Sequence, residues 1–158
     1  QLLAKSVNHS HLHLEHPNWG DEKKIQLVED ARAVSACAIS PDCKYIATAD
    51  RHNDHNVKIF EVESGDLVYG DKGGPDQIFD LSFTKRDGDY TLWSAGIKAM
   101  IQWKLDVMDK KKIIFGKKPR TSFACVTADD QGLAYGGGSN SLIYVVNGNT
   151  IKQTLDFH

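Results

Sequence analysis

Histidines gather near the start of the chain at a spacing that could bind a metal ion. His9, His11 and His13 alternate along the sequence, with His16 close behind, so on a β-strand the first three would share one face. Neutral imidazoles placed in this way are ligands for Zn²⁺ or Ni²⁺. No cysteine or carboxylate pattern in the sequence completes a defined site, and the alternative is a polar edge strand. We therefore expect no bound metal and no cofactor.

A second group of titratable residues, Arg51–His55, places an arginine, two histidines and an aspartate within one short segment. Asp54 beside His55 could carry out acid–base chemistry. The sequence supplies no serine or cysteine nucleophile with an oxyanion-type glycine turn to accompany them. We therefore interpret the segment as a loop held by Asx-type hydrogen bonds, and we predict no catalytic residues and no enzymatic activity.

The glycine run Gly136–Gly138 could suggest a phosphate-binding loop. It lacks the Lys-Ser/Thr pair of a Walker loop, and no helical pattern follows it. Small residues also stand at Thr48–Ala49 and Ser94–Gly96, at matching places in a repeat described below. We interpret all three as close-packed strand ends near a central channel.

The composition limits the class of protein that must position these residues. The 158 residues are 41% hydrophobic and carry a formal net charge of −2, so the chain can bury a core but has no global field to attract nucleic acid or anionic lipid. Apolar runs are far shorter than a membrane span. The odd number of cysteines, Cys37, Cys43 and Cys125, predicts a reducing, cytoplasmic setting, in which we expect them to be small buried apolar residues.

An internal repeat predicts the fold. Three segments share an apolar-alternating run, a turn and a second run that ends in small residues; they begin at Val34, Ile78 and Phe123. These starts are 44 and 45 residues apart, within the roughly 40 to 45 residue period of a four-stranded propeller blade. Third strands are expected at 56–63, 99–106 and 141–147. Fourth strands are expected near 67–69, 113–115 and 151–155.

The fold class is therefore all-β, a WD-repeat-type β-propeller with about three four-stranded blades and part of a preceding blade. We expect an N-terminal edge segment at 1–23 and a partial propeller at 24–158, with a strand at 24–28 and blades at 32–71, 76–116 and 121–157. The chain begins with Gln1, and three blades would leave exposed strand edges. We therefore expect the remaining blades of the same protein to be partners.

The third strands end in Phe60-Glu61, Trp103-Lys104 and Val145-Val146 rather than Trp-Asp, so the buried Asp-His-Ser-Trp network of regular WD repeats is not expected. More specific motifs are RAVSACAIS at 32–40, ADRHNDHNVKIFEVESGD at 49–66, LWSAGIKAMIQWKL at 92–105 and IIFGKKPR at 113–120. In order and spacing they resemble the first propeller of the echinoderm microtubule-associated protein-like (EML) family. The resemblance covers roughly 32–146 and implies a tandem pair of atypical propellers that associates with microtubules.

Basic residues are the candidate partner-binding site. We expect Lys110–Lys112 in a loop between third and fourth strands and Lys117, Lys118 and Arg120 between blades, which would place the two groups on opposite propeller faces. We favour the second group, together with basic residues of the same face; the candidates are Arg32, Arg51, His55, Lys98, Lys117, Lys118 and Arg120. Docking on acidic tubulin would weaken as salt rises. The alternative is solvated loop charge.

The expected function is that of a non-catalytic scaffold, part of a cytoplasmic, cytoskeleton-associated protein that binds tubulin or other proteins through propeller loops. We expect neither nucleic acid nor membrane as a partner. The alternative is a WD-repeat subunit of another intracellular or ciliary complex without direct tubulin contact.

Overall fold

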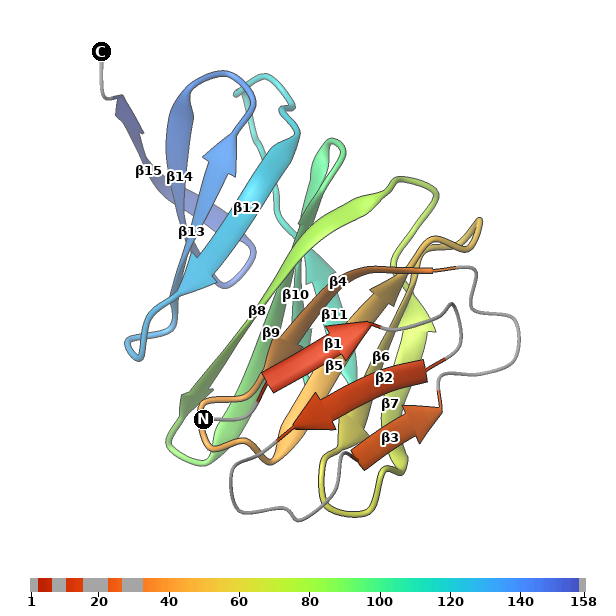
Figure 1. The fold of residues 1–158 in the computed structure, drawn as a ribbon. Coiled ribbons are helices and arrows are strands. Elements are labelled where there is room, and N and C mark those ends of the chain that lie inside the picture. Colours follow the sequence, from red (N-terminus) through yellow and green to blue (C-terminus); the bar gives the residue numbers. More distant parts are fainter. Residues whose placement is uncertain (1–2, 7–10, 16–22, 27–32, 157–158) are drawn as a thin grey trace.

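The computed structural model describes residues 3–6, 11–15, 23–26 and 33–156, and its secondary-structure elements are β-strands (Figure 1). In those ranges no helix is long and apolar enough to cross a membrane. Arg32, His9 and His16 lie outside the described residues.

The first strands form a three-stranded antiparallel sheet in the order β1-β2-β3. Its strands are β1 (Leu3–Ser6), β2 (His11–Glu15) and β3 (Lys23–Gln26). The last of these overlaps the strand expected at 24–28. The division between an edge segment at 1–23 and a partial propeller at 24–158 stays a prediction.

Three four-stranded antiparallel sheets follow, each with its strands in sequence order. Blade one consists of β4 (Val34–Ile39), β5 (Tyr45–Asp50), β6 (Asn56–Glu61) and β7 (Leu67–Lys72). Blade two consists of β8 (Ile78–Arg86), β9 (Asp89–Gly96), β10 (Ala99–Lys104) and β11 (Asp109–Lys112). Blade three consists of β12 (Phe123–Ala128), β13 (Leu133–Gly138), β14 (Leu142–Asn147) and β15 (Thr150–Asp156). The prediction of four strands per repeat is confirmed.

The three blades share a local irregularity that confirms the alignment of the repeats. The first two strands of every blade shift register one residue after the strand begins, between Val34/Ala36, Ile78/Asp80 and Phe123/Cys125. The residue that follows the second strand donates its amide back to the residue before the first strand, in the pairs Arg51 to Ala33, Ile97 to Gln77 and Ser139 to Ser122. Val34, Ile78 and Phe123 therefore occupy equivalent places.

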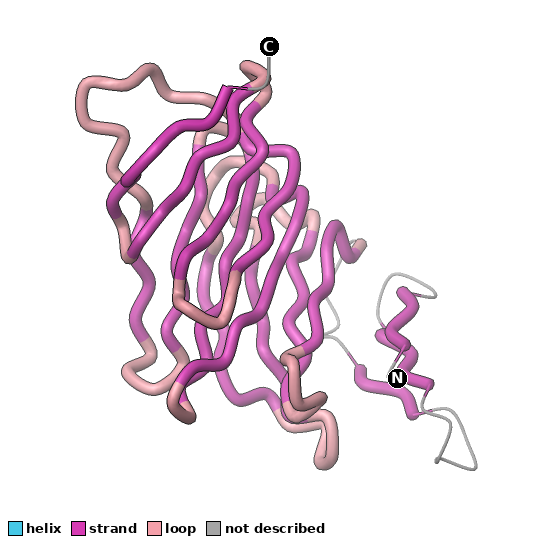
Figure 2. Tube along the Cα trace, turned by 90° about the vertical axis from the view of Figure 1, so that its left-hand side faces the viewer, coloured by secondary structure: helices cyan, strands magenta, loops and turns pink. Residues whose placement is uncertain are grey.

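The blades pack side by side through their first strands, since β8 contacts both β4 and β12 (Figure 1, Figure 2). The alternation of side chains in blade two explains how one sheet serves two interfaces. Leu92 and Ile101 belong to the core shared with blade one. Trp93 and Met100 belong to the core shared with blade three. Blade two is thus buried on both faces.

Blade two also contains one bond that the sequence did not predict. The Trp103 indole Nε1 donates a hydrogen bond of 3.0 Å to Ser94 Oγ, and both side chains are buried. A serine on the second strand and a tryptophan on the third therefore keep the Ser–Trp part of the WD network. The third strand ends in Trp-Lys rather than Trp-Asp, so the WD consensus motif does not predict this hydrogen bond.

Three predictions about particular residues are wrong. The fourth strand of blade two is β11, at Asp109–Lys112, not 113–115, because a turn at Leu105–Met108 lets the chain pair with β10 directly afterwards. Lys110–Lys112 is therefore strand and not loop. Cys37, Cys43 and Cys125, all expected to be buried, are exposed.

Candidate protein-binding site

The segment that joins blade two to blade three, Ile113–Arg120, is fixed at its start by both blades. Ile113 is buried and donates its amide to Met100 O at 2.9 Å. Ile114 then donates its amide to Asn149 O at 2.7 Å and forms a parallel bridge with Thr150, on the outer strand of blade three. The linker backbone is therefore held between two sheets.

The middle of the linker turns sharply and returns along the surface. The Phe115 ring packs against Phe123 and Tyr144, with ring centroids 6.0 and 6.5 Å apart. Gly116 has a positive φ of 61°, a conformation that glycine adopts without steric cost, and Lys118 N donates to Phe115 O at 3.0 Å. After this turn Lys118 Nζ contacts Thr154 Oγ1 of blade three at 3.4 Å, and Lys118 and Arg120 line a hollow together with residues of blade two.

The linker borders a hollow of about 440 Å³ that also receives two lysines of blade two. Its charged lining consists of Lys98, Lys112, Lys118 and Arg120, all exposed. The other lining residues are apolar or glycine, so the described lining contains no carboxylate. Four positive charges around one concave surface attract an acidic partner and raise its rate of association. We call this surface the basic hollow.

Lys98 is held in place by the junction between blades. It lies in the tight turn between β9 and β10 with a positive φ of 50°, which costs a residue with a side chain roughly 1–2 kcal/mol relative to ordinary backbone. Its amide donates to Ser122 Oγ at 3.2 Å, from the residue that precedes blade three. The two blades therefore fix the position from which this lysine projects.

Lys112 lines the basic hollow, although it was not among the predicted partner-binding residues. The expectation that Lys110–Lys112 and the linker cations lie on opposite faces is wrong, because Lys112 at the end of β11 lines the same hollow as Lys118 and Arg120. Lys110 has a different environment. Its Nζ contacts Asp71 Oδ2 at 2.7 Å and donates to Lys72 O at 2.6 Å, so its charge is compensated by blade one.

The remaining predicted residues are not part of the basic hollow. Lys117 is exposed on the linker but does not line the basic hollow. Arg51 and His55 lie in the loop between β5 and β6 of blade one. Sequence reasoning named Lys112 within the basic run Lys110–Lys112 but favoured the linker cations; the signal for its place was the apolar pair Ile113-Ile114, which marks where the chain leaves the blade.

The loop of blade one is organised by the buried Asp50 at the end of β5. Its carboxylate accepts hydrogen bonds from the amides of His52 and Asn56, at 3.0 and 2.9 Å, and from the Asn56 side chain at 3.1 Å. Asp54 instead contacts Lys72 Nζ at 2.9 Å, and the hydrogen bond from this lysine holds the pKa of Asp54 below its usual range. The loop is therefore an Asx-type structure in which Asp54 pairs with a lysine.

Within the ranges that the structure describes, no group of three or more His, Cys, Asp or Glu side chains could hold a metal ion. The backbone of β2 includes His11 and His13, but their neighbours His9 and His16 fall outside those ranges. Absence of a metal at the histidine group thus stays a prediction.

Comparison with known proteins agrees with the architecture. No family model matches the sequence. The chain is 43% identical over 138 residues, 85% of its length, to the ciliary WD repeat-containing protein ctxp80 of Euplotoides octocarinatus. It spans 19% of the length of that protein. The similarity supports a relation to WD-repeat proteins, and together with three equivalent four-stranded sheets it identifies the described chain as consecutive β-propeller blades of the WD-repeat type.

Proposed function

We propose that the chain is a non-catalytic scaffold module that binds an acidic surface of a partner protein through the basic hollow. The observation that supports the proposal is the convergence of Lys98, Lys112, Lys118 and Arg120 on one concave surface without a carboxylate in its described lining. The similarity to a WD repeat-containing protein supports a role in protein interaction. Partner-binding loops on a rigid scaffold are a common arrangement.

The partner that we propose is tubulin, in a cytoplasmic, cytoskeleton-associated protein. Tubulin has acidic surfaces that complement the basic hollow. The sequence motifs of this chain resemble those of the EML family, and a relative of this chain carries the word ciliary in its name. That relative is about five times as long as the chain, which supports our proposal that further blades of the same protein complete the propeller. Arg32, Arg51, His55 and Lys117 remain candidates for a wider contact surface.

Microtubule co-pelleting tests the proposal. We expect the protein to pellet with microtubules and to be released as salt rises. Replacing Lys98, Lys118 and Arg120 by Gln should weaken binding about tenfold, since each exposed charge pair contributes about 0.2–1 kcal/mol. A matched variant with Lys44, Lys111 and Lys152 replaced by Gln loses the same charge outside the hollow and should bind like the wild type.

The second candidate function is that of a subunit in another ciliary complex, without direct tubulin contact; the name of the relative favours it. It predicts that the protein stays in the supernatant at every salt concentration. Equal loss of binding in the two triple variants would contradict the basic hollow as the site.

A further inference from the structure

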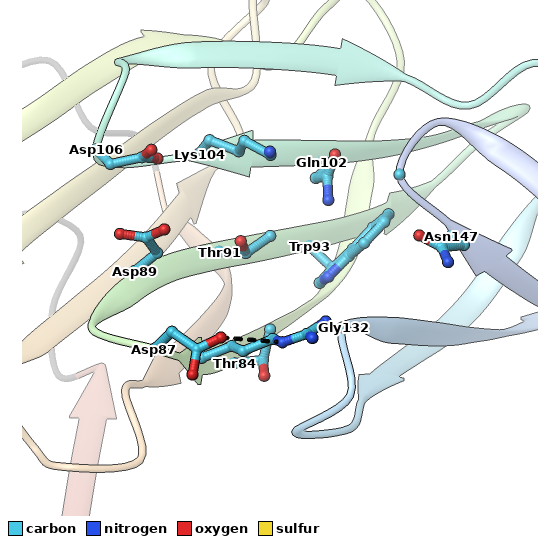
Figure 3. A pocket seen from close by; sticks show the side chains of 12 residues that line it. Thr84, Asp87, Asp89, Thr91, Trp93, Gln102, Lys104, Asp106, Gly132 and Asn147 are labelled. Carbon is cyan, nitrogen blue, oxygen red and sulfur yellow. Dashed lines mark ion pairs between the residues drawn. The ribbon is translucent and has the colours of Figure 1, made fainter.

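A second hollow, of about 310 Å³, lies between the sheet of blade two and the turns of blade three (Figure 3). Its walls come from β8, β9 and β10 on one side and from Gly132, Asn147 and Gly148 on the other. It shares no lining residue with the basic hollow. Its lining is polar and of mixed charge, so it suits a different ligand.

The unusual group in this hollow is the Trp93 indole. Trp93 is fully buried, and its Nε1 has no hydrogen-bond partner among the described residues. Figure 3 shows the ring projecting into the hollow from β9, with its nitrogen on the side of Thr84 and Asp87. The other described tryptophan, Trp103, donates to Ser94. A buried donor without an acceptor is costly in a native protein, so an acceptor from a ligand would relieve that cost.

The neighbours of Trp93 specify the kind of acceptor. Gln102 is its cross-strand partner in β10 and is 7% exposed, so its carboxamide can both donate and accept. The charges of the rim largely cancel, with Arg86 and Lys104 facing Asp87, Asp89 and Asp106. Arg86 is already held by Gln131 O at 2.8 Å and by Asp87 at 3.4 Å. This balance favours an uncharged acceptor over a full anion.

An exposed apolar turn lies directly beside the rim. Val107 and Met108 follow Asp106 in the turn between β10 and β11, and they are 60% and 53% exposed. Met108 has a positive φ of 50°, and its amide points to Leu105 O at 3.4 Å. Two adjacent apolar side chains held outward next to a polar hollow can cover an apolar residue of a bound segment.

We propose that this hollow binds a short segment of a partner protein that presents a glutamine or asparagine carboxamide next to an apolar residue. The carboxamide oxygen accepts the Trp93 indole N–H, its NH₂ group pairs with Gln102, and the apolar side chain packs on Val107 and Met108. Lys104 has a long, exposed side chain, which swings aside as the segment enters.

Tryptophan indole ¹⁵N–¹H NMR signals of the protein test the proposal, with N-acetyl-Leu-Gln-Leu-amide as the probe. Binding of a single residue pair is weak, so titration extends to about 10 mM. The Trp93 signal should move and the Trp103 signal should stay in place. Peptides with glutamate or norleucine in place of glutamine should bind at least about tenfold more weakly, because a site built for a hydrogen bond rejects an analogue that cannot form it.

Two variants separate binding from folding. Trp93→Phe keeps an aromatic ring but lacks the donor, so the folded variant should lose the effect of the peptide on backbone signals of β9 and β10. Val107→Ser with Met108→Ser alters only exposed side chains, so it keeps the fold and should weaken binding whether or not Trp93→Phe folds. A motionless Trp93 signal, or equal binding of the glutamate and norleucine peptides, would overturn the proposal and leave the basic hollow unaffected.

Discussion

Asp42 connects two blades through a single carboxylate. Its Oδ2 contacts Lys85 Nζ at 2.9 Å and accepts the hydroxyl of Tyr90 at 2.5 Å, while Oδ1 accepts the hydroxyl of Ser40 at 2.8 Å. Partial burial acts to raise the pKa of Asp42, but the hydrogen bonds from Tyr90, Lys85 and Ser40 outweigh it and hold the pKa well below the ordinary 3.8. The turn of blade one is thereby tied to β8 and β9 of blade two.

The lowered pKa of Asp42 predicts a pH dependence of stability. A carboxyl whose folded-state pKa lies below its unfolded value stabilises the fold above the unfolded pKa, and this contribution is lost as the pH falls through the folded pKa. Asp42→Asn should therefore lower the free energy of unfolding by about 1 kcal/mol at neutral pH, a modest value because the side chain is partly exposed. The gap between wild type and variant should narrow once the pH falls below about 4, and it should close only as the pH passes through the lowered pKa of Asp42 in the folded state.

Urea unfolding followed by circular dichroism at several pH values measures this difference. Asp66→Asn in an exposed turn of blade one provides the control and should show little change. A constant gap between wild type and Asp42→Asn across the whole pH range would show that the carboxylate charge does not contribute.

At the scale of the element, each blade has a bulge, the register shift between its first and second strands. The end of the second strand there lies close to the residues just before the first strand. In blade two, a Cβ atom added to Gly96 would lie 2.2 Å from Gln77 O and 3.1 Å from Ile78 Cα. Both are backbone atoms that cannot rotate away. At Gly70 of β7 an added Cβ would meet only side-chain atoms, at 3.7 Å or more.

These two glycines give a matched pair of substitutions. Gly96→Ala should destabilise the protein by about 1–3 kcal/mol or more, because the backbone of the bulge has to move. Gly70→Ala should stay within about 0.5 kcal/mol of the wild type. Thermal unfolding of both variants is the measurement, and equal midpoints would mean that the bulge can open without cost.

The strand period could be predicted from sequence because first, second and third strands alternate apolar and polar residues. The fourth strand of blade two could not, since Asp109–Lys112 has no apolar residue and its position depends on pairing with β10. The basic hollow could not be predicted from sequence either. Lys98 and Lys118 could be identified as surface cations, but their convergence with Lys112 depends on where the linker turns back.

At the scale of the whole molecule, blade two differs from blade three in how many faces are covered. The last residues of β9, Leu92–Gly96, are all buried, whereas buried and half-buried residues alternate along β13. Continuous burial of a strand indicates packing on both sides, and alternation indicates packing on one. The described chain provides neighbours for blade two on both faces.

Hydrogen exchange followed by mass spectrometry should reproduce this difference. Peptides from β9 and β10 should exchange more slowly than those from β13 and β14, because opening blade two exposes two cores rather than one. Peptides from β15 should exchange fastest within blade three. Equal protection of β9 and β13 would contradict the view that stability depends on flanking blades.

The linker bridge between Ile114 and Thr150 also has a mechanical consequence. The linker that shapes the basic hollow is anchored to blade three by the hydrogen bond from the Ile114 amide to Asn149 O, beside the outer strand, and by the contact of Lys118 Nζ with Thr154 Oγ1 on that strand. A pulling force that separates blade three from blade two has to break this tether together with the hydrogen bonds that join Asp80, Thr84 and Arg86 to blade three, and the four cations then move apart. Attraction for an acidic partner would thus fall as tension separates the two blades.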